Sequence, residues 1–397
     1  MERSGHLLER SPDAGERRSR APHRLLFGVV VSLGAALLSI LLAEAALRSI
    51  GYRTPVLLPD SIRAQYRIEP DARFVYRGYL PGNAEDFANP VVLNHSGFHD
   101  RDYAPERPSP STYRIMVLGD SYVAAWEVPL EATFHKRIEA RLGREDPLGR
   151  GSYQVLAFGQ GRTAQEREIE WMRQYAPIYH PDLILYVFFC GNDFMENDPE
   201  IFQQASAFGS RYIHEVVPRK IRFFQHLLLF PHLRVNGLLA EAGTDYYVEH
   251  LDRFDPTIAH ADLESPELGI YQNPLPRGWD AALDRTGKLL DVARKETSKL
   301  HARFAIASLS GPQAIGDLAG RTLWAEAKNP RFDFDRGDRW IRDWAERHHV
   351  PHLELGPPLV AIGRRKVFWK HDQHLNPDGH AAVADLLYPF LVGIARQ

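Results

Sequence analysis

The fold of this chain is decided by residues 115–121, whose sequence is IMVLGDS: four apolar residues followed directly by glycine, aspartate and serine. A short apolar run bounded by turn residues predicts a buried strand. Its carboxyl end, which carries Ser121, is the place where open α/β sheets keep their binding and catalytic groups. Because Gly, Asp and Ser are also common turn residues, the tripeptide indicates a function only if it has partners downstream.

Strand-like and helical patterns alternate along the chain from this point. The apolar runs predicted as strands cover residues 113–118, 153–158, 183–189 and 303–308. The helical patterns cover residues 133–142, 163–175, 338–348 and 377–394. This alternation predicts an α/β domain in which helices cover a parallel sheet. The last helix is expected to begin at Pro377, with Asn376 or Asp378 as its N-cap, so it fixes the residues just before it.

Composition limits the classes of protein to which the chain can belong. Its 397 residues carry a net charge of -3. No long basic stretch interleaved with aromatic residues follows the N-terminal region, so the features of a nucleic-acid-binding protein are missing. The single cysteine, Cys190, excludes an internal disulfide and predicts a buried packing residue. Asp120 and Asp193 are expected to brace their own turns, and without further ligands at suitable spacing we expect no metal and no cofactor.

The N-terminal region predicts membrane attachment. Residues 25–43 carry no charged side chain, and ~20 apolar residues are enough to cross the hydrocarbon core. Arginines precede this segment, which places the N-terminus inside the cytoplasm. We therefore expect a cytoplasmic tail at 1–24, a single-pass anchor in the inner (cytoplasmic) membrane at 25–50, and a periplasmic or extracellular body. One alternative is a signal peptide cleaved near Ala43, although its apolar core usually runs only ~7 to 15 residues. The other is a buried core helix, which is the weakest because such a long uncharged segment after an Arg-rich tail rarely packs inside a soluble domain.

The remainder of the chain divides into two parts. Residues 51–110 are rich in Pro, Asp, Arg and aromatic residues and are expected to form a lead-in and linker. Residues 111–397 are expected to form the catalytic domain. Within it, residues 199–276 fit no simple strand and helix unit. They predict an insertion that either pads the edge of the sheet or covers the site as a lid.

Four short blocks carry the candidate chemistry. They are GDS at 119–121, GQGRT at 159–163, GND at 191–193 and DQH at 372–374. The first three follow predicted strands, and the carboxyl ends of parallel strands meet at one edge of a sheet. The fourth lies directly before the final helix. We therefore expect all four blocks to converge on one site.

Together these blocks contain the groups that acyl transfer needs. Ser121 supplies a hydroxyl that becomes a nucleophile when a base takes its proton, and His374 is a base of suitable pKa. Asp372 can accept a hydrogen bond from the imidazole and fix its tautomer. The N–H groups of Ser121 and Gly161 and the side-chain amide of Asn192 are the candidates for an oxyanion hole.

Two of these assignments have competitors nearby. Gly159 belongs to the same block as Gly161, and Arg162 directly after Gly161 is an unusual neighbour for an oxyanion glycine. Residues Asp378 and His380 repeat the Asp-x-His spacing, but they fall in the first turn of the last helix. There an aspartate is more simply a cap or a partner of the helix dipole, so His374 is the favoured base.

The four blocks resemble those of the SGNH (GDSL-type) hydrolases, whose motif residues match Ser121, Gly161, Asn192 and His374 in order. The resemblance covers the chain from Tyr113 to its C-terminus. It implies a flavodoxin-like three-layer α/β/α sandwich and an esterase, lipase, thioesterase, carbohydrate deacetylase or acyltransferase. The stretch NHSGF at 94–98 resembles one found in the membrane-anchored bacterial branch of that family. The Asp-x-His spacing is similar to that of the branch with polysaccharide O-acetyltransferases.

The function expected from these features is a serine hydrolase of acyl esters. It would act through a Ser121 acyl-enzyme on an O-acyl or O-acetyl ester, either a small molecule or an acylated polysaccharide of the cell envelope. Residues 25–50 would attach the protein to the membrane, and no nucleic-acid partner is expected. A polysaccharide O-acetyltransferase with the same triad is one alternative, because hydrolysis and transfer share the acyl-enzyme. A non-catalytic glycan-binding envelope protein is the other.

Overall fold

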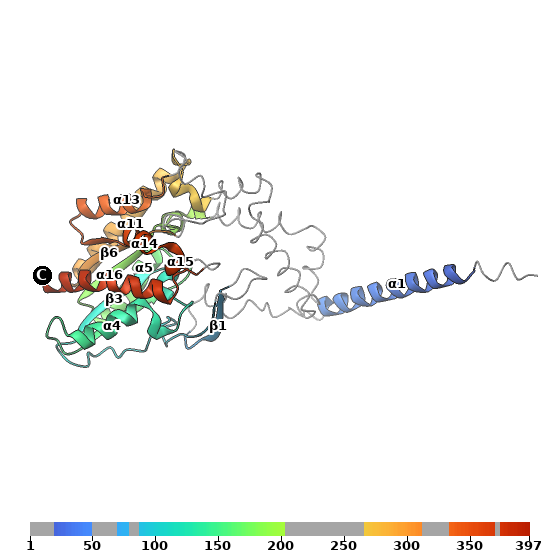
Figure 1. Cartoon of the computed structure of the whole chain (residues 1–397), viewed down its shortest axis with the longest axis horizontal. Coiled ribbons are helices and arrows are strands. Elements are labelled where there is room, and N and C mark those ends of the chain that lie inside the picture. Colours follow the sequence, from blue (N-terminus) through green and yellow to red (C-terminus); the bar gives the residue numbers. More distant parts are fainter. Residues whose placement is uncertain (1–19, 50–69, 79–86, 203–265, 312–332, 370–373) are drawn as a thin grey trace, which may run out of the picture. The chain divides into compact units, whose positions relative to one another are not determined.

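The computed structural model describes residues 20–49, 70–78, 87–202, 266–311, 333–369 and 374–397 (Figure 1). The chain forms two compact units. One comprises residues 1–57 and 220–236, and the other comprises residues 58–219 and 237–397. The candidate site lies in the second unit.

The described part of the first unit is helix α1 (Arg20–Ser49), which has 30 residues. It begins at Arg20, so the last residues of the expected cytoplasmic tail are helical. Its described side chains are exposed, among them Phe27 at 71% and Leu33 at 65%. The expectation of a transmembrane segment at 25–50 is not supported: in the part of the chain that the structure describes, no helix has the length and apolarity needed to cross a membrane.

The second unit is built on a five-stranded parallel sheet. Its strands are β3 (Tyr113–Gly119), β4 (Tyr153–Gly159), β5 (Leu183–Phe189), β6 (Arg303–Leu309) and β7 (His352–Glu354). The order across the sheet is β4-β3-β5-β6-β7, and every neighbouring pair is parallel. Numbered within the sheet this is 2-1-3-4-5, the order of flavodoxin-like sheets. The expected α/β class with a parallel sheet is thus confirmed.

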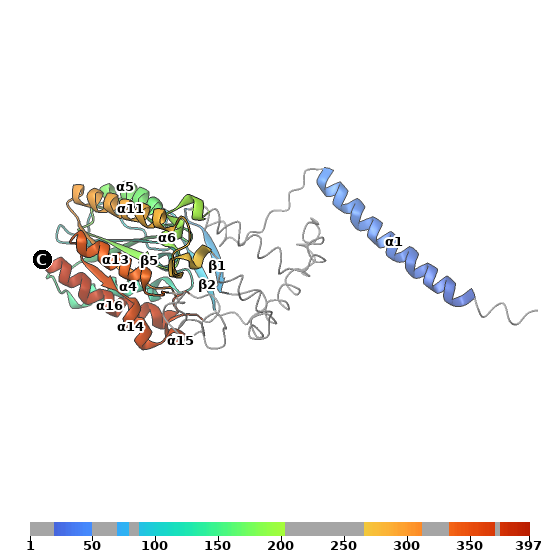
Figure 2. The same cartoon turned by 90° about the horizontal axis from the view of Figure 1, so that it is seen from above.

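Helices cover both faces of this sheet (Figures 1 and 2). One face packs against α4 (Phe134–Glu145), α14 (Gly356–Ile362), α15 (Arg364–Val367) and α16 (Pro377–Arg396). The other packs against α5 (Gln165–Tyr179), α11 (Trp279–Lys299) and α13 (Arg336–Arg347). Strands β3 and β5 are buried at every position, as expected for central strands of a sheet covered on both sides.

Short elements connect these layers. They are α3 (Ser121–Ala124), η1 (Leu130–Ala132), α6 (Asp193–Glu196) and η4 (Pro266–Tyr271). Most of the expected insertion, residues 203–265, lies outside the described residues, so its expected role as padding or lid stays a prediction. Its C-terminal end does not protrude, because Ile270 and Tyr271 of η4 are buried in the core on the α11 side.

The segment expected as a lead-in and linker contains an antiparallel hairpin of β1 (Arg73–Gly78) and β2 (Phe87–Val92). Its residues Phe74 and Val91 form a small core with Trp126, which lies just beyond α3. The side-chain amide of Asn89 donates to the carbonyl oxygens of Trp126 and Val128 at 2.9 and 2.7 Å. The hairpin is therefore bound to the chain segment that follows the serine block.

Candidate active site

Ser121 lies at the point where β3 passes into the single turn of α3. The Asp120 carboxylate caps this turn by accepting the Tyr122 N–H at 2.9 Å, as expected for an aspartate that braces its own turn. Two glycines allow α3 to lie directly on the sheet. Gly119 and Gly159 are paired across β3 and β4, and a Cβ on Gly159 would lie 2.4 Å from the Ala124 nitrogen. The serine is thus held at the sheet edge by backbone packing.

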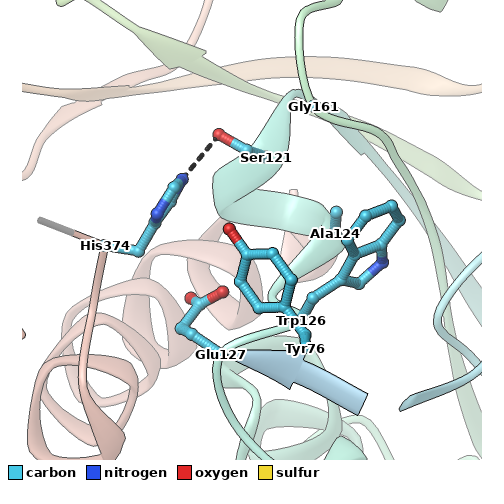
Figure 3. Close-up of a pocket in the computed structure, with 7 residues that line it drawn as sticks. All are labelled: Tyr76, Ser121, Ala124, Trp126, Glu127, Gly161 and His374. Atoms are coloured by element: carbon cyan, nitrogen blue, oxygen red, sulfur yellow. Dashed lines mark hydrogen bonds between the residues drawn. The ribbon is translucent and has the colours of Figure 1, made fainter. Parts of the chain in front are cut away.

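His374 faces this serine from the segment before α16. Its Nε2 lies 2.9 Å from Ser121 Oγ (Figure 3). The backbone around it is fixed, because its carbonyl accepts the Trp369 N–H at 2.8 Å. Next to it, the Asn376 side chain caps α16 by accepting the Gly379 N–H at 2.9 Å. The predicted convergence of the serine block and the DQH block is therefore observed for Ser121 and His374.

Asp372, expected to orient His374, lies outside the described residues. Its role as third member of a triad therefore stays a prediction.

Three of the expected residues line one pocket of about 270 Å³. The residues that line it are Tyr76, Ser121, Ala124, Trp126, Glu127, Gly161 and His374. The structure thus separates the two competing glycines: Gly161 lies at the pocket, whereas Gly159 packs against α3. Arg162, directly after Gly161, adopts a left-handed backbone conformation with φ of 60°, which turns the chain sharply at this point.

Asn192 follows β5 as expected, but it is not among the residues that line this pocket. Its side-chain amide nitrogen donates to Glu196 Oε1 at 3.3 Å. The following residue, Asp193, is fully buried and accepts hydrogen bonds from the Phe189 N–H at 3.0 Å and from Gln165 Nε2 at 2.8 Å. Asp193 therefore fixes the turn that carries Asn192.

Three buried carboxyl groups, those of Asp120, Glu168 and Asp193, lie close to the serine block. Burial raises the pKa of Asp120 to about 6, against the opposing effects of the Tyr122 N–H and of His374. Burial also raises the pKa values of Glu168 and Asp193 well above their usual range, and their repulsion with Asp120 adds to the shift. Burial therefore disfavours the charged form of both carboxyls.

Among the described residues, no group of three His, Cys, Asp or Glu side chains is arranged to hold a metal ion. A serine hydroxyl in hydrogen-bond contact with a histidine nitrogen, at the wall of a pocket, is the arrangement required for nucleophilic attack assisted by a base.

Four pocket residues were not among the candidates from the sequence, and one of them, Ala124, is the last residue of α3. Tyr76 comes from the β1–β2 hairpin, and Trp126 and Glu127 follow α3. Glu127 is paired with His380, whose Nε2 lies 3.0 Å from Glu127 Oε1. No sequence pattern joins Glu127 to His380, which lies in the first turn of α16.

No protein-family model and no curated protein matches this sequence. Solved structures with a similar chain path include the acetyl xylan esterase AlAXEase, with 12% identity, 70% of this chain and 98% of that chain covered, and a TM-score of 0.39. The psychrotrophic esterase EstA from Pseudoalteromonas sp. has 11% identity, coverages of 72% and 99%, and a TM-score of 0.37. A lipase/acylhydrolase from Enterococcus faecalis has 9% identity, coverages of 71% and 96%, and a TM-score of 0.36. At these identities, the site residues themselves are the basis for a functional conclusion.

Proposed function

We propose that this protein is a serine esterase that cleaves acyl esters through a Ser121 acyl-enzyme. The observation that carries the proposal is the 2.9 Å contact between Ser121 Oγ and His374 Nε2 at the wall of a pocket. A base must lie within about 2.6–3.2 Å of the proton donor that it activates, and this pair meets that condition without a ligand.

The proposed reaction has two halves. His374 Nε2 takes the hydroxyl proton while Ser121 Oγ attacks the ester carbonyl carbon, and the same proton then passes to the departing alcohol. In the second half a water molecule attacks the acyl carbon and gives a proton to His374, which then passes that proton to Ser121 Oγ as the bond between Oγ and the acyl carbon breaks and the carboxylic acid leaves. Asp372 is proposed to orient the imidazole and to stabilise its protonated form. Each half returns His374 to the neutral state.

The negative charge that develops on the carbonyl oxygen needs donors. We propose the backbone N–H groups of Ser121 and Gly161, together with the side-chain amide of Asn192. Gly161 lines the pocket, which supports its place in this group. Asn192 does not line the pocket, so its side-chain amide has to turn toward the substrate to take part.

The proposed substrate is an ester with a short acyl group, such as acetyl, on a carbohydrate or a cell-envelope polymer. The aromatic side chains of Tyr76 and Trp126 in the pocket wall beside Ser121 support a small acyl group and a sugar-like alcohol part. Transfer of the same acyl group to a sugar hydroxyl is the second candidate, which the Asp-x-His spacing of residues 372–374 favours. The two reactions differ only in whether water or an alcohol attacks the acyl-enzyme.

The location of this unit outside the cytoplasm is also part of the proposal. It rests on the sequence alone, on the uncharged residues 25–43 and on the arginines that precede them. Digestion of intact cells and of spheroplasts by an added protease tests it: loss of the protein only after the outer barrier is opened supports a periplasmic location, and protection in spheroplasts contradicts it.

The catalytic proposal is tested with p-nitrophenyl acetate and a panel of acetylated glycans, each with and without an added acceptor sugar. Ser121→Ala is expected to lower kcat/KM by at least about 10⁴-fold, because the nucleophile is lost. Ser298→Ala is the matched control, since Ser298 is an exposed serine on α11. Full activity of Ser121→Ala on every ester contradicts the proposal. Acylated acceptor formed in place of free acid identifies the transferase.

A further inference from the structure

Glu127 is a carboxylate in the wall of the pocket that contains Ser121 and His374. The residue is only 2% exposed, so it is nearly removed from water and yet borders the pocket. Figure 3 shows its side chain together with Tyr76 and Trp126 on one side of the Ser121–His374 hydrogen bond. Buried carboxylates are rare unless they are paired or serve a ligand, so the partners of Glu127 decide its role.

One carboxylate oxygen of Glu127 is fixed by His380. The Phe134 N–H donates to His380 Nδ1 at 3.2 Å, so that nitrogen carries the lone pair and the imidazole proton lies on Nε2. Nε2 therefore donates to Glu127 Oε1 at 3.0 Å. Both ring nitrogens of His380 are thus engaged, Nδ1 by the Phe134 N–H and Nε2 by Glu127. Glu127 is therefore oriented by a donor that is itself held in place by the backbone of α4.

No cation among the described residues balances this carboxylate. His380 is the only basic side chain described within 4.0 Å of it. Burial lowers the pKa of His99, and the nearby Glu127 charge offsets only part of that effect. Burial likewise holds the pKa of His135 well below its usual range, while Lys136 is paired with Asp100 at 2.5 Å. The Glu127 carboxylate is therefore left to accept a hydrogen bond from the pocket.

The shape of the pocket favours a hydroxyl donor over a cation held by aromatic faces. Trp126 is only 5% exposed, and its ring packs edge-on against Phe74 at 5.0 Å and against Tyr76 at 5.7 Å between ring centroids. A cation site of the aromatic kind needs ring faces that are open to the ligand. In an acetyl ester, the acyl group has no donor, and only the alcohol part can offer a hydroxyl.

We propose that Glu127, held by His380, selects esters whose alcohol part carries a free hydroxyl close to the ester group, by accepting a hydrogen bond from that hydroxyl. This inference rests on the proposed esterase function and narrows it to esters of polyols and sugars. Glu127 is a residue that binds the substrate, whereas His380 acts through it as a positioning residue.

The test compares two acetate esters of the same size, 2-hydroxyethyl acetate and propyl acetate. The wild-type protein is expected to prefer the first. In Glu127→Gln, the His380 donor keeps the amide oxygen, and the amide nitrogen turns to the pocket, so the acceptor is replaced by a donor. The ratio of the two kcat/KM values is expected to fall by about 10-fold, the difference typical of one charge-assisted hydrogen bond. Glu166→Gln, at an exposed glutamate on α5, is the matched control with an unchanged ratio.

Other outcomes overturn the inference. An equal loss of kcat/KM on both esters means that Glu127 has only a structural role, and unchanged kcat/KM values for both esters mean that it does not touch the substrate. Acetylcholine distinguishes a cation site: if wild type prefers it to 2-hydroxyethyl acetate and Glu127→Gln abolishes that preference, the hydroxyl assignment is wrong. A failure of the esterase proposal itself is recognised separately, because a fluorophosphonate then leaves Ser121 unlabelled. A labelled Ser121 without discrimination between the two acetates overturns the Glu127 assignment alone.

Discussion

His374 and His380 lie six residues apart at the start of α16, yet the structure places them in opposite situations. His374 is half-buried, and its Nε2 faces a serine hydroxyl at the pocket wall. His380 is fully buried, and both of its ring nitrogens are occupied, one by the Phe134 N–H and one by Glu127. The difference shows that an imidazole can act as a base only where one of its ring nitrogens faces a reacting group. His380, whose ring nitrogens are both engaged, instead holds Glu127 in the wall of the pocket.

The largest expected effect is a loss of activity that distinguishes His374 from His380. His374→Ala is expected to lower kcat/KM by about 10⁴-fold, because the base is lost, and to change the free energy of unfolding by no more than about 1 kcal/mol. Ester hydrolysis and urea denaturation measure the two quantities. His95→Ala is the control, since that side chain is 83% exposed. Substantial activity in His374→Ala would remove His374 from the reaction.

His380→Ala is expected to give the opposite pattern. The substitution leaves the buried Glu127 carboxylate and the Phe134 N–H without their partner, and opens a cavity beside α4. The free energy of unfolding is expected to fall by about 3 kcal/mol, as measured by urea denaturation at pH 7. The folded protein should keep far more activity than His374→Ala does. A stable but inactive His380→Ala variant would mean that the roles assigned to the two histidines are reversed.

The smallest expected effect concerns Asp120, whose carboxyl lies close enough to His374 for the two charges to interact. Its pKa is raised to about 6 by burial, against about 3.9 in an unfolded chain. The unfolded state therefore loses this proton first as pH rises, and wild type loses stability between about pH 4 and 6. Asp120→Asn keeps the acceptor for the Tyr122 N–H and removes the titration.

Asp120→Asn is accordingly expected to gain stability over wild type across this window, by at most about 3 kcal/mol at pH 7. Denaturation curves of both proteins between pH 4 and 8 provide the measurement. If the stabilities of wild type and Asp120→Asn change in parallel between pH 4 and 8, the Asp120 carboxyl has the same pKa in the folded and the unfolded state. That result would also mean that no buried charge lies beside His374.

The sheet and the contact between Ser121 and His374 could be predicted from sequence because each depends on a local pattern. Apolar runs identified β3, β4, β5 and β6 to within a residue or two. The rule that the carboxyl ends of parallel strands converge then placed Ser121 and Gly161 at one pocket. Of the DQH block, His374 lies at this pocket, and its position could be anticipated because α16 has a recognisable start at Asn376 and Pro377.

The parts that could not be predicted lack such a pattern. Strand β7 has only three residues, too few for an apolar run to stand out. Helix α11 follows a segment that fitted no simple unit and was not anticipated. The β1–β2 hairpin lies in a stretch whose Pro, Asp and Arg content indicated a linker, although alternate residues of β2 are buried. The Glu127–His380 pair joins residues 253 positions apart, and neither side chain belongs to a recognised motif block.

The central claim, that His374 activates Ser121, is tested most directly by reacting the folded protein with a fluorophosphonate and mapping the adduct by mass spectrometry. The account predicts a single adduct on Ser121, with a rate of labelling that falls by at least about 10³-fold in His374→Ala. An adduct on another residue, or labelling of Ser121 at the same rate in both proteins, would contradict it.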